Sequence, residues 1–361
     1  MHNFILNLFL PGFLSLFISL MIGRLLYKSN LPVAILDIPN KRKIHTNPTP
    51  LIGGITILFS SLFIMLLFNL LNDDRSNFFI IFGMFFFFIG FFDDLFDWDF
   101  KKKIILQILG VFFFLSAVDL NIEYLTFSTI TSEFKLINYL IIGLWMLLII
   151  NAFNFFDGIN FLAGSLSIVF FVSYAIFYNV TNELLPFTLM VILIFAIFGF
   201  LVYNRAPAKM FLGDAGSMFL GFTIAGFPII FSPSTHNSLD ITFPVIVSFI
   251  LISDTLFVVI NRIKNRKNPF YPDKSHLHHQ LLNLIFRNRY VVLVILIGSI
   301  LHSLLAFKSS DLNLFWLVFY LIILQIVFII LPRFLPALFA KYKLWGLKHI
   351  YDKMINNLQK K

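Results

Sequence analysis

The feature that most constrains the fold is a series of apolar segments, each about 20 residues long, the length a helix needs to cross the hydrocarbon core of a bilayer. Eleven such segments lie near residues 4–23, 51–71, 78–92, 104–120, 136–151, 161–178, 185–203, 217–232, 241–261, 290–307 and 313–332. The third is short and the fifth ends on a polar motif, so ten is the alternative count. Hydrophobic residues make up 59% of the chain and charged residues 12%, too few charges to cover a surface that faces water. The sequence therefore predicts an all-α polytopic integral membrane protein.

Lysine and arginine indicate the orientation, because cytoplasmic segments of membrane proteins carry an excess of both. With the N-terminus outside and eleven crossings, 24 of the 27 Lys and Arg residues fall on the cytoplasmic side, and only Arg75, Lys135 and Lys308 fall outside. This predicts a periplasmic N-terminus and a cytoplasmic C-terminus. Residues 1–334 form the predicted transmembrane catalytic domain, and residues 335–361 form a basic amphipathic tail along the membrane surface. The sequence contains no basic soluble module, so we expect no nucleic-acid partner.

The first polar cluster is FFDDLFDWDFKKK, residues 91–103, at the cytoplasmic end of the third segment. Asp93 and Asp94 fall at a helix C-terminus, where the helix dipole and the neighbouring carboxylate both oppose a negative charge. Something positive should compensate, either a divalent metal or the lysines from Lys101 to Lys103. The alternative is a solvated loop of mixed charge.

The second cluster is NAFNFFDGINFLAG, residues 151–164. Asn151, Asn154 and Asp157 recur every three residues, so on a helix they share one stripe. Polar groups in an apolar stretch are costly and usually functional, although polar caps at a helix end are the alternative. Gly158 permits a sharp turn before the sixth segment.

The third cluster is NRAPAKMFLGDAGSMFLG, residues 204–221. Gly213 and Gly216 bracket Asp214 at the mouth of the eighth segment, where exposed backbone N–H groups suit a phosphate. Asp214 can bind a hard cation through oxygen or cap a helix. No Gly-Lys-Ser/Thr follows, so this is not a Walker P-loop.

The fourth cluster is the loop of residues 262–289, in which His276, His278 and His279 lie among several cations, including Arg262. The chain has no cysteine, and histidines beside cations suit a phosphate or a sugar better than zinc. The alternatives are an incidental His-rich loop or a weak transition-metal site. Together the four clusters offer acids for a divalent metal and cations for phosphates, which is the equipment of phosphoryl transfer. The membrane setting adds a lipid substrate.

These motifs, in this order, resemble those of the polyprenyl-phosphate N-acetylhexosamine-1-phosphate transferases of glycosyltransferase family 4. The resemblance runs from LDIPNKRKIHTNPTPLIGGI, residues 36–55, to HLHH, residues 276–279. The early DIPNKRKIH segment and the HLHH spacing favour the WecA/TagO-like branch over the MraY-like phospho-MurNAc-pentapeptide transferases, which carry three consecutive histidines.

The resemblance implies that a UDP-activated N-acetylhexosamine and undecaprenyl phosphate react at the cytoplasmic face of the bacterial inner membrane. The lipid phosphate oxygen attacks the β-phosphorus, UMP leaves, and undecaprenyl-diphospho-HexNAc forms with Mg²⁺, or alternatively Mn²⁺, as cofactor. O-antigen, capsule, enterobacterial common antigen and teichoic acid pathways can all start with such a step. A homodimer is possible.

Residue roles follow from the same resemblance. Asp93 and Asp94 match the family's catalytic Asp pair and Asp157 its third catalytic acid, while Asp214, with Asp94, matches the metal site. Lys101 matches the position that holds the lipid phosphate. The nucleotide- and sugar-binding positions are matched by Asn151, Asn154, Asn160, Asn204, Lys209, Arg262, His276, His278 and His279.

One departure concerns the sugar. The family commonly reads DGIDGLAG where this chain reads DGINFLAG, so Asn160 replaces an acid and Phe161 a glycine. We expect a variant N-acetylated sugar, such as a 6-deoxy form, to be preferred. If UDP-GlcNAc turns over faster than its 6-deoxy analogue, this expectation is wrong. A cation-coupled transporter is the alternative of another class, but it requires acids near the midplane and on both sides, and here they gather at one side.

Overall fold

The computed structural model describes residues 2–29, 35–38, 48–118, 124–232, 238–268, 275–285 and 287–334. The predicted tail of residues 335–361 and most of the DIPNKRKIH segment therefore lie outside the described residues.

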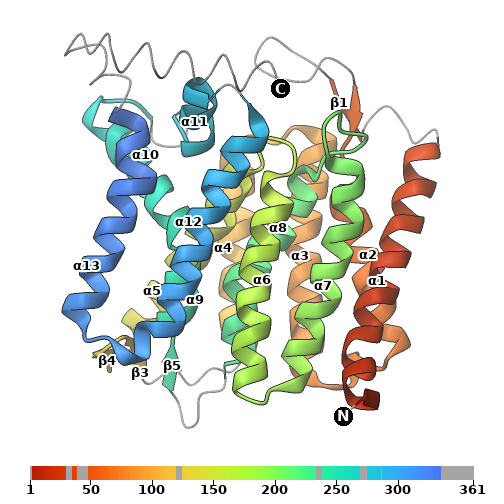
Figure 1. Cartoon of the computed structure of the whole chain (residues 1–361), viewed down its shortest axis with the longest axis horizontal. Coiled ribbons are helices and arrows are strands. Elements are labelled where there is room, and N and C mark those ends of the chain that lie inside the picture. Colours follow the sequence, from red (N-terminus) through yellow and green to blue (C-terminus); the bar gives the residue numbers. More distant parts are fainter. Residues whose placement is uncertain are drawn as a thin grey trace.

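Long helices that run side by side, alternately up and down, build the molecule (Figure 1). Their bounds are α1 (His2–Lys28), α2 (Gly53–Leu67), α3 (Asp74–Phe96), α4 (Phe100–Ala117), α5 (Lys135–Phe156), α6 (Leu162–Val180), α7 (Leu184–Asn204), α8 (Gly213–Ile230), α9 (Thr242–Val247), α10 (Phe249–Lys264), α12 (Asn288–Lys308) and α13 (Leu314–Gln325). Helix α11 (Leu277–Ile285) is short and lies at one end of the bundle. A π-turn, η4 (Ile326–Ile330), continues α13, and the short 3-10 turns η2 (Leu70–Asn72) and η3 (Ser309–Asp311) occupy connections.

Eight helical segments in the described part of the chain are long and apolar enough to cross a membrane. They are 9–28, 74–96, 135–156, 162–180, 184–204, 213–230, 288–311 and 314–334. The predicted segment 51–71 falls on the shorter helix α2, the segment 104–120 on α4, and the segment 241–261 is divided at Ser248 between α9 and α10. The prediction of a mostly helical polytopic membrane protein is therefore confirmed.

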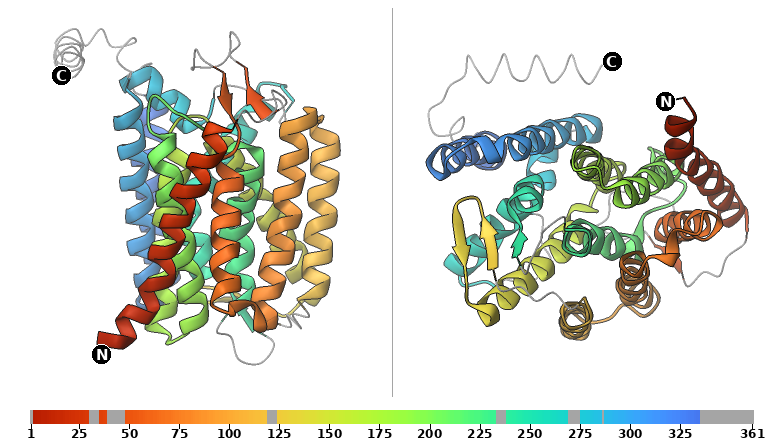
Figure 2. Two further views of the ribbon diagram at one scale, coloured as in Figure 1. Left: turned by 90° about the vertical axis from the view of Figure 1, so that its right-hand side faces the viewer. Right: turned by 90° about the horizontal axis from the view of Figure 1, so that it is seen from below.

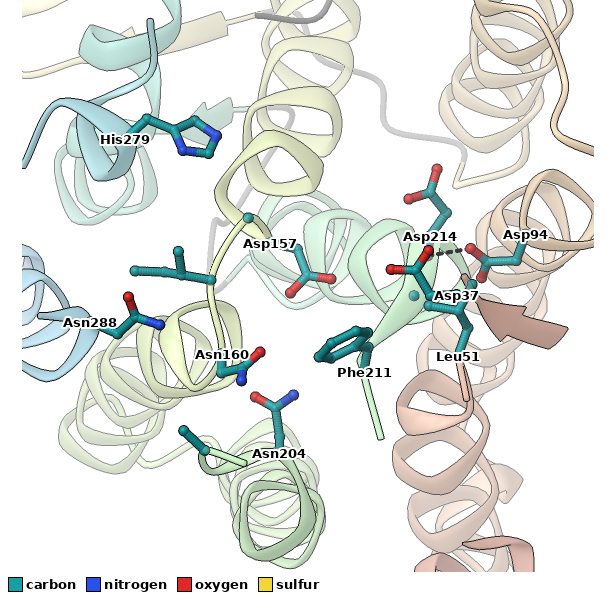
Figure 3. A pocket seen from close by; sticks show the side chains of 14 residues that line it. Asp37, Leu51, Asp94, Asp157, Asn160, Asn204, Phe211, Asp214, His279 and Asn288 are labelled. Carbon is teal, nitrogen blue, oxygen red and sulfur yellow. Dashed lines mark hydrogen bonds between the residues drawn. The ribbon is translucent and has the colours of Figure 1, made fainter. Parts of the chain in front are cut away.

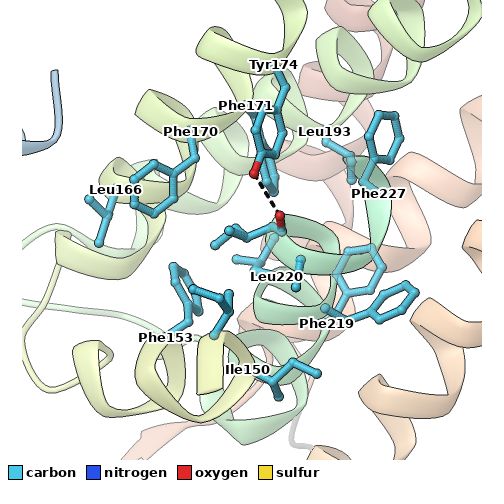
Figure 4. Close-up of a cluster of buried hydrophobic side chains, with 14 of the residues drawn as sticks. Ile150, Phe153, Leu166, Phe170, Phe171, Tyr174, Leu193, Phe219, Leu220 and Phe227 are labelled. Carbon is cyan, nitrogen blue, oxygen red and sulfur yellow. Dashed lines mark hydrogen bonds between the residues drawn. The ribbon is translucent and has the colours of Figure 1, made fainter. Parts of the chain in front are cut away.

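Helix α8 is the central helix, with 89% of its span buried, against 17% for the span 314–334. Glycines let its neighbours approach closely, as small residues do between membrane helices. A side chain at Gly54 of α2 would meet the backbone of Gly216, and one at Gly90 of α3 would meet the carbonyl of Asp214. Around α8 lies a dense aromatic core, in which the buried hydroxyl of Tyr174 donates to the carbonyl of Ile224 (2.8 Å; Figure 4).

Short strands close both ends of the bundle, an addition that the helical sequence pattern does not predict. Strand β1 (Leu36–Asp37) pairs antiparallel with β2 (Thr49–Pro50), and this hairpin stands at one end (Figure 2). At the other end, β3 (Tyr124–Phe127) pairs antiparallel with β4 (Ile130–Ser132) and parallel with β5 (Ser238–Asp240). A bridge between Leu51 and Phe211 joins the first end to the loop before α8, which fixes where α8 begins.

Candidate active site

A cavity of about 570 Å³ opens at the end of the bundle where α3, α5 and α7 end and α8 begins (Figure 3). Eight of its fourteen lining residues have polar side chains, and the lining comes from segments far apart in the sequence: Asp37, Leu51, Asp94, Asp157, Gly158, Ile159, Asn160, Asn204, Ala206, Phe211, Gly213, Asp214, His279 and Asn288. Residues of the first three predicted clusters thus line the same cavity, and the histidine loop contributes His279.

Asp94 caps helix α8. Its carboxylate accepts hydrogen bonds from the backbone N–H of Asp214 (2.9 Å) and of Ala215 (3.0 Å). Gly213, with φ of 76°, leaves room for this carboxylate, because a side chain there would meet Asp94 Oδ2 at 2.7 Å. The N-terminal amides that the sequence suggested for a phosphate are therefore bound by an acid of the protein itself, which suits the positive end of the helix dipole.

The positive charge beside the Asp pair comes from Lys103. Its ammonium donates to Asp93 Oδ2 (2.7 Å) and also pairs with Asp214 Oδ2. Asp93 accepts a further hydrogen bond from the backbone N–H of Trp98 (3.0 Å). Lys101, the lysine chosen from the sequence, is exposed and does not line the cavity.

The two asparagines of α5 form hydrogen bonds in different parts of the structure. The side-chain amide of Asn154 donates to Asp214 Oδ1 (3.0 Å) and to the hydroxyl of Ser217 (2.7 Å), so it orients the acid of α8. Asn151, one turn earlier, donates to Gln107 of α4 (2.8 Å) and to the carbonyl of Leu147, away from the cavity lining.

Asp157 differs from the other acids. It follows the last residue of α5, faces the cavity, and its carboxylate has no hydrogen-bond or ion-pair partner among the residues that the structure describes. Burial raises its pKa well above the usual range, and the nearby charges of Asp214 and Asp94 raise it further. Such a group favours a proton or a cation that enters the cavity.

The turn after Asp157 contains two positions that suit glycine, residues 158 and 161. A side chain at Gly158 would collide with His278 Nε2 (2.3 Å), so glycine allows the histidine to pack against this turn. The left-handed conformation belongs to Phe161, with φ of 73°, at the position where the family commonly has glycine. Asn204 holds the turn by accepting from the Phe161 N–H (2.7 Å) and donating to the carbonyl of Met210 (3.0 Å).

The three histidines occupy different depths. His279 lines the cavity, on the side opposite Asp94 and Asp214 (Figure 3). His278 is buried, and neither ring nitrogen has a hydrogen-bond partner in the described chain. Burial, followed by the charge of His279, lowers the pKa of His278 to about 3, which keeps its ring neutral. His276 is buried and bound to Asp254 (2.8 Å).

The remaining predicted residues lie at varying distances from the cavity. Asn160 lines it, whereas Arg262 is buried in α10 and is not among the lining residues. Lys209 is exposed, and its ammonium lies 5.8 Å above the ring of Tyr27.

Sequence reasoning assigned no site role to Asp37, Phe211 or Asn288, and it named Lys103 only as one of three lysines that could compensate the charge of Asp93 and Asp94. Asp37 and Lys103 belong to motifs that had been recognised, and their charge was the available signal. Asn288 begins α12 and lines the cavity, but no pattern around it pointed there.

The donor set fits a hard divalent cation. Four aspartates line the cavity, and no Lys or Arg of the described ranges does so. Mg²⁺ prefers oxygen ligands and is usually bound by one or two carboxylates together with substrate phosphates. Within the described ranges no three His, Asp or Glu residues are close enough to form a complete protein cage, so an ion here would share its ligands with a substrate.

Comparison with known proteins identifies the family. The family model for glycosyl transferase family 4 matches residues 77–232. The chain is 31% identical over 318 residues to a probable undecaprenyl-phosphate N-acetylglucosaminyl 1-phosphate transferase of Bacillus subtilis, covering 87% of this chain and 88% of that protein. It is 28% identical to an undecaprenyl-phosphate α-N-acetylglucosaminyl 1-phosphate transferase of Thermotoga maritima, covering 82% and 90%. It is 30% identical to a phospho-N-acetylmuramoyl-pentapeptide-transferase of Staphylococcus carnosus, covering 64% and 77%. With relatives matched over 77 to 90% of their length, this chain belongs to glycosyl transferase family 4.

Proposed function

We propose that this protein transfers a HexNAc-1-phosphate from a UDP-sugar to undecaprenyl phosphate and releases UMP. The observation that carries the proposal is the cavity lined by Asp94, Asp157 and Asp214, in a chain whose relatives bear the names of such transferases. An acidic cavity at the ends of apolar helices suits a reaction between a lipid phosphate and a soluble sugar nucleotide.

The reaction requires one bond exchange at phosphorus. An oxygen of the lipid phosphate forms a bond to the β-phosphorus of the UDP-sugar, and the bond from that phosphorus to the bridging oxygen breaks. UMP leaves with the electron pair, and the product is undecaprenyl-diphospho-HexNAc. Positioning and neutralisation of charge dominate such transfers.

In this proposal Asp157 accepts a proton from the lipid phosphate or orients it. Its raised pKa and its lack of a partner in the described chain support this role, because a carboxylate that needs a proton is a suitable base. Lys103 balances Asp93 and Asp214, and Asn154 fixes the rotamer of Asp214.

Mg²⁺ is the proposed cofactor, held by Asp214 with Asp94 beside it. Bound there, it would supply positive charge to the phosphates of both substrates. The support is the excess of acids over cations around the cavity, because two phosphate-bearing substrates repel an acidic wall unless a cation accompanies them.

The orientation of the chain is also a proposal: eleven crossings, a periplasmic N-terminus, and a site on the cytoplasmic face of the bacterial inner membrane. The charge distribution supports it, since 24 of 27 Lys and Arg residues fall on one side. The cavity lies at the end of the bundle away from the N-terminal end of α1 (Figure 1).

The second candidate is the MraY-like reaction, which a relative of 30% identity favours. We assign this chain to the HexNAc branch because of the HLHH spacing. Asn160 lines the cavity, which supports a role in selecting the sugar.

The test is transfer of radiolabel from UDP-GlcNAc to undecaprenyl phosphate by purified, detergent-solubilised protein, with and without Mg²⁺. Asp157→Asn is the test variant. Asp311→Asn is the matched control, because it makes the same chemical change at an exposed pair beyond the other end of α12. We expect labelled lipid and UMP from the wild type and the control only. Product from UDP-MurNAc-pentapeptide and from no UDP-HexNAc would replace the proposal by the MraY-like reaction.

A further inference from the structure

Asp254, in α10, is the only fully buried acid among the described residues, and it does not line the cavity. Its carboxylate is held from three directions. His276 Nδ1 lies 2.8 Å from Oδ2, the backbone N–H of Leu277 donates to Oδ1 (2.9 Å), and Arg333 pairs with Oδ1. The bond to Leu277 fixes the first residue of α11. Asp254 therefore holds His276, the start of α11 and Arg333 in fixed positions relative to α10.

Arg333 comes from the last helical turn that the structure describes. It follows the π-turn η4, a local change of helix phase that is often found at functional positions. One arm of its guanidinium donates to the carbonyl of Ile329 (2.8 Å), the other reaches Asp254, and its carbon centre lies 4.4 Å above the ring of Phe257. The side chain is only 6% exposed. Its two arms therefore join the end of the bundle to α10.

A line of rings leads from this pair to the cavity. His276 stacks on Phe155 (4.9 Å) and lies parallel to His278 (6.3 Å), and His278 contacts His279 (4.2 Å between ring centres). His278 also packs against Gly158. Both His279 and Gly158 line the cavity, so a shift at Asp254 moves one wall of it.

We propose that Asp254 and Arg333 are positioning residues that place His279 for binding the UDP-sugar. This inference rests on the proposed function. His279 lies on the side of the cavity opposite Asp94 and Asp214, so the pair acts on the sugar nucleotide and leaves the lipid phosphate unaffected.

Stability alone is a weak reason for this arrangement. A buried ion pair can often be replaced by well-packed apolar residues without loss of stability. An arginine whose two arms bind a carboxylate and a carbonyl has a fixed direction, which a lysine lacks. The arrangement therefore specifies where α11 begins.

The experiment compares Arg333→Met with Arg75→Met in the full-length protein. Arg75 is a matched control, because it also pairs with an aspartate, Asp73, and lies over a phenylalanine ring, but at the first turn of α3, away from the cavity. The KM for the UDP-sugar should rise about tenfold in Arg333→Met. Losses of this size are typical when a metal-binding residue loses the group that orients it by a hydrogen bond, and we expect a similar effect on the orientation of His279. The KM for undecaprenyl phosphate should not change. For the UDP-sugar, the KM of Arg333→Lys should lie between those of the wild type and Arg333→Met, and the KM of Arg75→Met should match the wild type.

Amide hydrogen exchange of residues 276–285 gives a readout that does not depend on turnover. It should be faster in Arg333→Met and unchanged in Arg75→Met. Equal changes in the KM of both substrates, or unchanged exchange in this segment, would overturn the inference. If the wild type transfers no sugar phosphate, the proposed function fails, and the exchange result still decides whether Arg333 positions α11.

Discussion

The two walls of the cavity use the same residue type in opposite ways. On the wall formed by α3 and α8, each aspartate has partners: Asp94 binds two amides of α8, while Asp93 and Asp214 share the ammonium of Lys103. On the wall formed by the turn after α5, Asp157 has no side-chain partner in the described chain. Acids with partners join helices, whereas an acid without one is available to a substrate.

This difference has a physical origin. A carboxylate removed from water costs free energy that partners must offset, and the first wall provides those partners. The second wall leaves the cost uncompensated until a cation or a proton arrives, as expected where activity is maintained at the expense of stability.

The largest effect should follow removal of Mg²⁺. Chelation should abolish transfer, and returning Mg²⁺ should restore it. Added Mg²⁺ should also raise the thermal midpoint of the wild type, because the cation relieves repulsion on the unpaired wall, and it should do so less in Asp157→Asn. Differential scanning fluorimetry provides the check. Full activity in a chelator would remove the metal from the proposal.

Asp157→Asn should lower the transfer rate by about 10³-fold, within the range for loss of a general base. The metal-free thermal midpoint should stay the same or rise, because the substitution removes an unpaired charge. Initial rates and thermal unfolding of the same preparation test both parts. A clear drop in midpoint would show that Asp157 supports the fold after all.

Asp94→Asn should have the opposite signature in stability. The single amide oxygen of asparagine can accept from only one of the two α8 N–H groups, and the side chain carries no charge for the helix dipole, so a loss of about 1 kcal/mol is expected. Transfer should fall as well. The measurement is the denaturation midpoint relative to the wild type, and an unchanged midpoint would contradict the capping role.

Phe161→Gly should have the smallest effect. Glycine adopts φ of 73° without strain, whereas phenylalanine does not, so the substitution should stabilise the protein by about 1 kcal/mol. Thermal unfolding measures the gain. Comparison of UDP-GlcNAc with its 6-deoxy analogue in this variant then tests whether residue 161 affects sugar choice.

The fold class and much of the cavity lining are predictable from the sequence. Apolar length gives the membrane helices, and polar residues at their ends indicate the site, as with Asp94, Asp157 and Asp214. The three lysines show the limit. Their sequence positions do not reveal which one faces α3, because that depends on the rotation of α4 about its axis, and only Lys103 turns inward.

The same limit applies to Phe161 and to Asp254. A bulky residue gives no signal for a left-handed backbone, so the conformation of Phe161 follows from tertiary contacts such as the one with Asn204. Asp254 pairs with Arg333, 79 residues further along the chain, and no local pattern connects them.

The enclosure of α8 has a consequence for how the protein is made. It is the most buried of the eight candidate spans and also the least apolar, so a bilayer would accept it less readily than the others on its own. Its packing partners α2, α3 and α5 all precede it in the chain. During synthesis they would already be in the membrane when α8 emerges, ready to receive it and, with it, the aspartate that completes the site.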